Sequence, residues 1–396
     1  MKAQGLLIKA LSFCLAVILL VPSLGIAADK DKKEDKKAYE FTTEYAVKHT
    51  PVKNQYWTGT CWCFATVSFL ESEALRMNNG ELDLSEMFIV RHTYPRKASN
   101  YIRLHGKANF SQGGQSHDVL NIVRDYGLAL EKDYNGMRIN EKRHNHSEMV
   151  SVMSSMMDAL LKGRGRKLTP RWMEALEAVL DVYLGKPVEN FKYKGKTTTP
   201  KVFAKSIGID PDNYVELTSY SIYPFYQKCR LEIPDNWDYN RDYYNVPIDD
   251  LERLVDYALK NGYSIAWDGD VSEKEFSSRE TGVAVVPVID YEDKTKEQKN
   301  EKPTEPVKEK EVTQDMRQET FDNFTTTDDH LMHIVGLSRD QNGAKYYYTK
   351  NSGGTVDRAY DGFVYLSRPY FRLKTTALMV HKDAIPKDLK KKLNIK

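Results

Sequence analysis

Excess charge, cysteine and long apolar runs are all scarce in this sequence. Its 58 lysine and arginine residues nearly balance 56 aspartate and glutamate residues, leaving a formal net charge of +2. Such a balance gives no reason to expect a nucleic acid or an acidic partner. The hydrophobic content of 41%, with 11% aromatic residues, excludes a disordered chain, and 396 residues suffice for a large domain or two lobes around a cleft.

The N-terminus has the pattern of an export signal. Lys2 and Lys9 precede an apolar run over residues 10–20, and small residues follow as far as Ala28. We therefore predict a cleaved signal peptide over residues 1–28 and an exported protein, either periplasmic or secreted. The alternative is an uncleaved anchor, although the run is short for a membrane span. A charged lead-in is expected over residues 29–48.

A helix is predicted to begin at Cys61. Apolar residues then alternate four and three positions apart, which is the spacing of one stripe along an amphipathic helix. This stripe would bury Cys63 and leave Cys61 free to face a cleft. The N–H groups and the dipole of a helix N-terminus favour negative charge, so we expect them to lower the pKa of the Cys61 thiol. The stripe consists of Cys63, Val67, Leu70, Ala74 and Met77.

Gln55 lies six residues before Cys61, across a turn that contains Gly59. From there its amide could donate a hydrogen bond to an oxyanion, beside the backbone N–H of Cys61. The alternative for a single cysteine is an ordinary buried residue of a helix. The rest of the chain has to decide between these two interpretations.

Three short blocks around the cysteine match a known pattern: VKNQ at residues 52–55, GTCW at 59–62 and FA at 64–65. Together they resemble the active-site segment of papain-like cysteine peptidases. The resemblance implies that Cys61 is the nucleophile and that a histidine and an asparagine lie far downstream. It also places Gly113, Gly114 and Trp62 at the substrate. For the two glycines, a turn without a ligand is the alternative.

His330 and Asn351 are the downstream residues that fit. Residues 329–336 have the pattern of a strand, which would place His330 on the same face as Met332 and Ile334, with His333 on the opposite face. His330 also has the family's spacing to the next glycine. The resemblance implies that His330 is the base toward the thiol and the acid toward the leaving amine. Asn351 would hold the imidazole in the productive tautomer.

One position departs from the family pattern. Gly353 stands where the family usually has a tryptophan, whose ring covers the hydrogen bond between histidine and asparagine. Its absence would weaken the orientation of His330 unless another side chain covers the site. This departure motivates a second hypothesis, a catalytically weak peptide-binding protein on a peptidase scaffold.

A second match lies in residues 246–272, VPIDDLERLVDYALKNGYSIAWDGDVS, where we predict a helix over 251–260 and a strand over 263–268. This segment is similar to the bleomycin hydrolase or aminopeptidase C branch of the family. The branch has a helical insertion, expected here at about residues 141–200, and it forms a ring-like homo-hexamer. In that branch a C-terminal arm receives the amino group of the substrate. The residues after Pro386 look too few for a full arm.

Other elements follow from local patterns. We predict helices that begin near Ser85 and over residues 118–126, and a strand-like segment over 214–226. The insertion contains a second helix capped by Thr169 and Pro170. Residues 290–315 are rich in Lys and Glu and are expected to form a mobile surface loop. The first helix of the insertion has an apolar stripe of Met149, Met153, Met156 and Leu160.

The cysteines that remain after signal removal allow two states. Cys63 and Cys229 are either two buried thiols, which we favour, or a disulfide pair. Cys61 and Cys63 would point about 200° apart on a helix. Because His330 and His333 would also point apart, we expect no metal site and no cofactor.

These observations predict an α+β, papain-like fold of two lobes over residues 49–396. A helical lobe would carry Cys61, and a β-rich lobe would carry His330 and Asn351. The expected activity is thiol-dependent hydrolysis of peptides through a thioester acyl-enzyme, with an aminopeptidase as the main prediction. An exported endopeptidase with an open cleft is the alternative, motivated by the short C-terminus. Peptides are the expected partners, and nucleic acids are not.

Overall fold

Strand β10 (His330–Asp340) lies at the centre of the main sheet. It pairs with β7 (Ile265–Gly269) on one side and with β11 (Lys345–Lys350) on the other, both antiparallel. The end of β10 distant from His330 also pairs with β1 (Phe41–Ala46). The computed structural model describes residues 38–396 except 139–141, 164–166, 292 and 301.

Eleven of the described strands form this one sheet. Along it the order is β5-β6-β4-β13-β7-β10-β11-β12-β9-β8, with β1 beside β10, and β2 and β3 form a separate hairpin. The remaining strands are β2 (Phe191–Tyr193), β3 (Lys196–Thr198), β4 (Tyr214–Thr218), β5 (Gln227–Cys229), β6 (Tyr243–Asn245), β8 (Phe276–Ser277), β9 (Val283–Ala284), β12 (Phe363–Ser367) and β13 (Thr375–His381).

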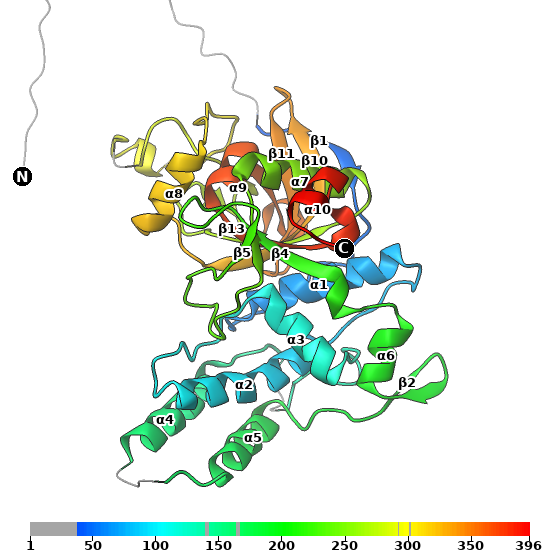
Figure 1. Cartoon of the computed structure of the whole chain (residues 1–396). Helices are drawn as coiled ribbons and strands as arrows, with labels where there is room; N and C mark the ends of the chain where they lie inside the picture. The colour runs from blue at the N-terminus through cyan, green and yellow to red at the C-terminus, as the bar shows by residue number, and fades with distance from the viewer. Residues whose placement is uncertain (1–37, 139–141, 164–166, 292, 301) are drawn as a thin grey trace, which may run out of the picture. The chain divides into compact units, whose positions relative to one another are not determined.

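Helices α2 to α6 gather on one side of α1, and α7 to α10 lie with the sheet on its other side (Figure 1). Two hydrophobic cores follow this division, one among α1 to α6 and one between the sheet and α7, α9 and α10. The predicted α+β class, with a helical part and a β-rich part, is confirmed. The helices are α1 (Cys61–Arg76), α2 (Glu86–Arg103), α3 (Ser116–Tyr126), α4 (Ser147–Lys162), α5 (Arg171–Tyr183), α6 (Pro200–Ser206), α7 (Ile248–Lys260), α8 (Gln314–Asp322), α9 (Arg368–Lys374) and α10 (Lys387–Lys392).

Helix α1 begins at Cys61, as predicted. The prediction of a single apolar stripe is wrong, because every residue from Cys61 to Ala74 is buried. Helices α2 and α3 cover one side of α1, and strands β7 and β10 cover the other. A helix enclosed in this way needs no solvent-facing stripe. It places its N-terminus directly between the helical part and the sheet.

The folded unit begins earlier than the sequence suggests. Residues 38–396 form one compact unit, and the predicted lead-in over residues 29–48 therefore ends inside it, at strand β1. The predicted signal peptide over residues 1–28 lies outside the described residues. In the part of the chain that is described, no helix has the length and apolar character to cross a membrane.

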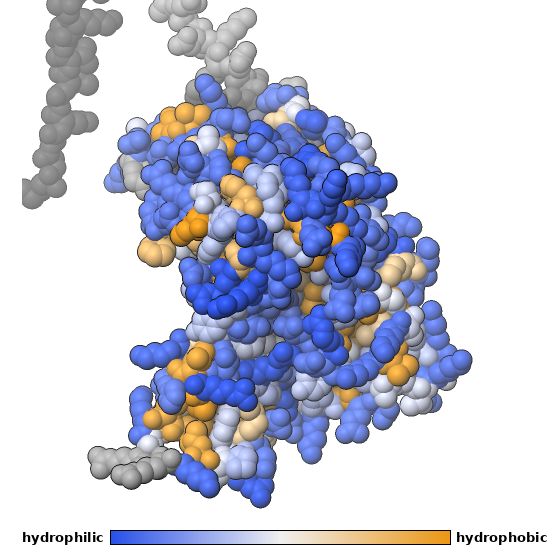
Figure 2. Space-filling view, in the orientation of Figure 1, coloured by the Kyte–Doolittle hydropathy of each residue, from blue (hydrophilic) through white to orange (hydrophobic). Residues whose placement is uncertain are grey.

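The inserted helices differ in detail from their predicted patterns. The buried stripe of α4 is Met149, Met153 and Met157, so Met157 replaces Met156. The N-cap of α5 is Pro170 rather than Thr169. Some apolar side chains remain exposed nearby, such as Val182 on α5, and Figure 2 shows hydrophobic residues on the surface over this region.

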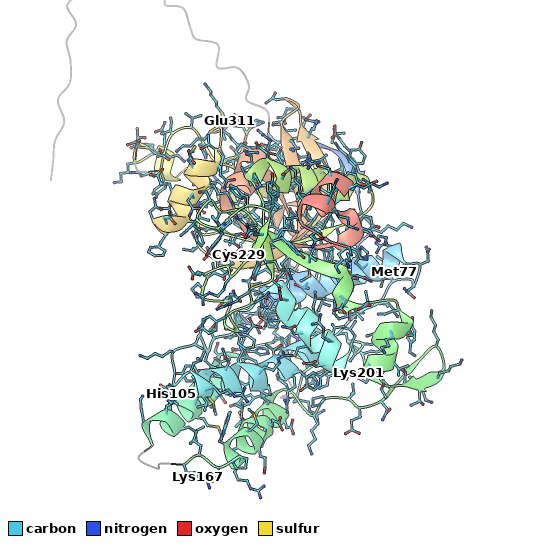
Figure 3. The ribbon with its side chains drawn as sticks, viewed as in Figure 1. Met77, His105, Lys167, Lys201, Cys229 and Glu311 are labelled. Carbon is cyan, nitrogen blue, oxygen red and sulfur yellow. The ribbon has the colours of Figure 1, made fainter. Side chains whose placement is uncertain are left out.

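The charged segment is less free than predicted. Its second half packs on the sheet, where the Glu309 carboxylate accepts hydrogen bonds from the Val286 N–H over 2.7 Å and the Ser367 hydroxyl over 2.5 Å. Val312 is buried, and its carbonyl accepts from Arg372. A mobile surface loop is therefore the wrong description of this half, in which Figure 3 labels Glu311.

Candidate active site

Cys61 occupies the first turn of α1, and its side chain is 8% exposed. Its backbone N–H has no hydrogen-bond acceptor among the described residues, as is usual at the start of a helix. The backbone of Leu331, the residue after His330, forms a hydrogen bond with the thiol. Cys63 and Cys229 are free thiols, as favoured, although Cys229 on β5 is only half-buried (Figure 3).

Burial controls the charge of the Cys61 thiol. It raises the pKa of Cys61 to about 12. The Leu331 hydrogen bond opposes this shift, whereas the carboxylates of Asp235, Asp268 and Asp328 add to it. The lowered pKa expected from the helix terminus is therefore wrong, because desolvation of the thiol outweighs the helix dipole. The thiol is protonated at neutral pH and requires a base before it can attack.

A hydrogen bond of 2.8 Å joins His330 Nε2 to Asn351 Oδ1. The backbone N–H of Ser352 donates to the same Oδ1 over 2.7 Å, which identifies that atom as the amide oxygen. Nε2 must therefore carry a proton, and Nδ1 remains an acceptor. Burial lowers the pKa of His330, the Asn351 bond opposes that shift, and the positive charge of Arg358 lowers the pKa further.

The two faces of β10 are used as the alternation predicts. Met332 and Ile334 belong to the core of the sheet, whereas His333 is buried against α1 and its Nδ1 lies 2.8 Å from the Ser68 hydroxyl. His333 therefore joins the sheet to α1 and takes no part in the candidate site. The described contacts include no hydrogen bond between Cys61 Sγ and His330. The contact that links them is the hydrogen bond between the thiol and the backbone of Leu331, the residue after His330.

Gln55 is fixed from both ends of its amide. Nε2 donates to the Thr58 carbonyl over 2.7 Å, and Oε1 accepts from the Ser352 hydroxyl over 2.5 Å. The Gln55 N–H also donates to the Ser352 carbonyl over 2.9 Å. Since an amide nitrogen carries two hydrogens, the second hydrogen of Nε2 has no acceptor among the described contacts. The residue next to Asn351 thus orients the predicted oxyanion donor.

The space beside Gly353 is occupied by Arg358. A side chain at position 353 would begin 2.6 Å from the guanidinium carbon of Arg358, which is closer than atoms can approach. Arg358 also donates to the Gly353 carbonyl over 2.9 Å and to the Ser278 hydroxyl over 3.2 Å. Arg358, from later in the chain, therefore occupies the space that a side chain at position 353 would take, which the sequence analysis missed.

The residues predicted to contact the substrate are enclosed by other parts of the chain. Trp62 is 1% exposed and donates its indole N–H to the Gln112 carbonyl over 2.9 Å, so it supports the glycine loop from below. Gly114 is also buried, and Asp235 lies over Gly113 at the place that a Cβ would take. The substrate contacts of Gly113, Gly114 and Trp62 stay predictions.

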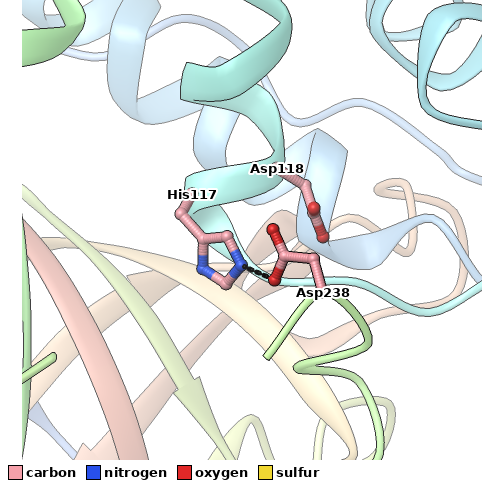
Figure 4. Close-up of side chains that lie close together, drawn as sticks. All are labelled: His117, Asp118 and Asp238. Atoms are coloured by element: carbon pink, nitrogen blue, oxygen red, sulfur yellow. Dashed lines mark hydrogen bonds and ion pairs between the residues drawn. The ribbon is translucent and has the colours of Figure 1, made fainter. Parts of the chain in front are cut away.

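A charged network holds the segment that contains Asp235. His117 Nδ1 lies 2.9 Å from Glu216 and Nε2 lies 3.1 Å from Asp238 (Figure 4). Burial alone would lower the pKa of His117, but these two carboxylates raise it well above its ordinary value. The ligand atoms of His117, Asp118 and Asp238 lie within 4.8 Å of one another. Because His117 uses both nitrogens and Asp118 accepts from Trp237, the donor set fits a hydrogen-bond network better than a metal ion.

Two carboxylates near the thiol were also missed. Asp268 lies opposite Leu331 in the pairing of β7 with β10, and Asp328 precedes His330 by two residues. Gln115 Nε2, from the start of α3, donates to both oxygens of Asp328 over 3.2 Å. A sequence signal existed, since two aspartates in succession before a buried strand are unusual.

Comparison with known proteins points in one direction. A family model described as "Peptidase C1-like family" matches residues 95–396, which is more than half of the chain. The chain is 21% identical over 393 residues to Aminopeptidase G of Lactobacillus delbrueckii subsp. lactis, covering 88% of this chain and 84% of that protein. It is 22% identical over 411 residues to the mitochondrial Cysteine proteinase 1 of Saccharomyces cerevisiae, covering 91% and 80%.

The likeness extends to a solved structure. The crystal structure of PepW from Lactobacillus rhamnosis HN001 superposes with a TM-score of 0.68 at 18% identity. The match covers 89% of this chain and 84% of that one. At 18% identity the superposition shows that the two chains share a fold.

Proposed function

Because the chain belongs to the Peptidase C1-like family and is a cysteine peptidase of papain-like fold, we propose that Cys61, His330 and Asn351 hydrolyse peptide bonds through a thioester intermediate. The observation that carries this proposal is the bond between His330 Nε2 and Asn351 Oδ1. It leaves Nδ1 as the only basic nitrogen, on a histidine whose neighbour Leu331 contacts the thiol.

The proposed reaction starts from a neutral thiol and a neutral imidazole. Cys61 Sγ attacks the peptide carbonyl carbon while its proton passes to His330 Nδ1, so that a C–S bond forms and the carbonyl becomes an oxyanion. The free hydrogen of Gln55 Nε2 and the unpaired Cys61 N–H stabilise that oxyanion. The C–N bond then breaks, and the leaving amine takes the proton from His330.

The second half releases the acyl group. Water attacks the thioester carbon and gives a proton to His330 Nδ1. The C–S bond breaks, the carboxylic acid leaves, and the thiolate recovers the proton. Asn351 keeps Nε2 protonated through both halves, so the same nitrogen of His330 accepts and donates.

An aminopeptidase is the activity that we propose within this class. Its support is the family resemblance and the name of one relative, Aminopeptidase G. An endopeptidase remains the alternative outcome of the test.

The test is hydrolysis of one fluorogenic peptide in two forms, free and acetylated at its amino group, under reducing conditions. The Cys61→Ala variant is the control and should lose at least about 10⁴-fold in kcat. Cleavage of the free form only supports an aminopeptidase, and cleavage of both forms supports an endopeptidase. Absence of Cys61-dependent cleavage across a broad peptide panel would overturn the enzyme mechanism in favour of a binding scaffold.

We also propose that the protein is exported, on the basis of the basic and apolar pattern of residues 1–28. Expression of the full chain in a Gram-negative host, followed by fractionation and N-terminal sequencing, tests this. A mature protein that begins near residue 28 or 29 in the periplasmic fraction supports export. An intact Met1 on a cytoplasmic protein would contradict it.

A further inference from the structure

A buried carboxylate, Asp268, and a half-buried one, Asp328, stand beside the nucleophile without a cationic partner in the described part of the chain. Asp268 is 2% exposed, and Asp328 lies close enough for each carboxylate to raise the pKa of the Cys61 thiol. None of the ion pairs in the described part of the chain uses Asp268 or Asp328, whereas other buried acids such as Glu252 bind lysine or arginine. A buried charge without a partner is costly, so this pair is prepared for a cation that comes from outside.

The hydrogen bonds of the pair also leave room for a donor. Asp268 Oδ2 accepts from the Thr376 hydroxyl over 2.6 Å, but Oδ1 is buried and receives no donor. Asp268 and Asp328 are also joined by a side-chain hydrogen bond, and two carboxyl groups can bond to each other only by holding a proton between them. An ammonium group, with three donors and a positive charge, would replace that proton and satisfy both carboxylates.

The contact between Gln115 and Asp328 joins the helical part to the sheet at this pair. Gln115 directly follows the glycine loop of the helical part, and Asp328 lies two residues before His330, where strand β10 of the sheet begins. Its amide bonds both oxygens of Asp328 and so joins the two parts next to the nucleophile. A substrate that extended beyond this pair would have to break the hydrogen bonds between Gln115 and Asp328.

We propose that Asp268 and Asp328 bind an ammonium group of the substrate, and that this group is the free α-ammonium of the residue whose carbonyl Cys61 attacks. The α-nitrogen lies only two covalent bonds from that carbonyl carbon, which suits carboxylates that act on the thiol itself. A lysine side chain would need longer reach. The proposal rests on the proposed peptidase function and explains how an aminopeptidase could recognise its substrate.

The experiment compares kcat/KM for three substrates that share one leaving group. The first is an aminoacyl amide with a free α-amino group, and the second is the same compound acetylated at that group. The third carries an additional N-terminal lysine whose α-amino group is acetylated, so that its only ammonium group is on the side chain. The variants are Asp268→Asn, Asp328→Asn and the double substitution. Asp329→Asn is the matched control, because it removes the same charge one residue away. Alkylation of Cys61 in each variant checks that the site is intact.

We expect the double variant to lose at least about 30-fold in kcat/KM on the free substrate. Hydrolysis of the acetylated form should be unchanged or faster, and Asp329→Asn should keep the wild-type ratio of the two. An unchanged ratio in the double variant would overturn the proposal, and selective loss on the lysine substrate would overturn the assignment to the α-ammonium. Failure of the wild type on all three substrates would instead contradict the peptidase mechanism.

Discussion

The guanidinium of Arg358 lies where a side chain at position 353 would stand, and its Nε donates to the Gly353 carbonyl over 2.9 Å. The two residues are therefore complementary: the glycine makes room, and the arginine fills it. Arg358 brings a positive charge that lowers the pKa of His330, in addition to the larger effect of burial. An uncharged ring at this place would cover the site without that electrostatic effect.

We predict that Arg358→Gln moves the acid limb of the kcat/KM profile to higher pH. The acid limb reports the loss of one proton from the imidazolium of His330 while the Cys61 thiol is neutral. Because the pKa of His330 is lowered, this limb lies below pH 6.5. Removing the guanidinium lets the His330 pKa rise, because the positive charge of Arg358 no longer opposes the imidazolium. A pH–rate profile measures the shift. Arg358→Lys keeps the charge and should keep the limb, and an equal shift in both variants would contradict the electrostatic explanation.

Gln55 allows a prediction about the oxyanion. Gln55→Ala removes one donor but leaves the Cys61 N–H, so kcat should fall by about 10²–10³-fold with little change in KM. Ser352→Ala removes only the hydroxyl that orients Oε1 and should cause a smaller loss. Steady-state kinetics on a cleaved peptide measures both. A larger effect of Ser352→Ala than of Gln55→Ala would argue against a direct role of the amide.

The network around His117 predicts a pH-dependent stability. Because the folded pKa of His117 is raised, its contribution is complete below the unfolded value of about 6.5 and is lost as the pH rises through the folded value. His117→Gln leaves the Glu216 and Asp238 carboxylates without their cation and should cost about 3–5 kcal/mol. Thermal unfolding between pH 5 and 9 should show the largest loss at the acidic end. A loss that grows toward pH 9 would contradict the ion-pair interpretation.

Local patterns predicted the elements with strong boundary signals. Helix α7 begins after Pro247 and α1 begins at Cys61, because capping and apolar periodicity depend on neighbours in the sequence. Strand β1 could not be predicted in this way. Most of its side chains are exposed, and only pairing with the distant β10 makes it a strand.

In the candidate site, too, the residues in local sequence motifs could be predicted, whereas those placed by distant parts of the chain could not. Cys61, His330 and Asn351 lie in short motifs, and the structure brings His330 and Asn351 within hydrogen-bond distance. Arg358 lies in no motif, because its place beside Gly353 depends on how the loop between β11 and β12 turns back. The raised pKa of Cys61 was missed for a related reason: the helix N-terminus is visible in the sequence, but the burial around it is not.

The unpaired carboxylates predict a gain of stability on substitution. Burial, with repulsion from Asp235, raises the pKa of Asp268 to about 7. Burial, with repulsion from Asp268 and Asp235, raises the pKa of Asp328 well above its ordinary range. Between pH 4 and 7 the folded protein therefore keeps protons that the unfolded chain releases, and its stability falls as the pH rises. Asp268→Asn and Asp328→Asn remove this titration, so the Tm of each variant should exceed that of the wild type by several degrees above pH 7.

The same gain should be small at pH 4 and vanish well below it, because an aspartate of the unfolded chain is protonated only below its ordinary pKa of about 3.9. Asp315→Asn, on the exposed face of α8, is the control for a general effect of removing one negative charge. Scanning calorimetry at pH 4, 6 and 8 without substrate measures the difference. If the variants are less stable than the wild type at pH 8, a cation already occupies the pair in the free protein. That result would contradict the proposal that the empty pair of Asp268 and Asp328 destabilises the free protein and that a bound ammonium group removes this cost.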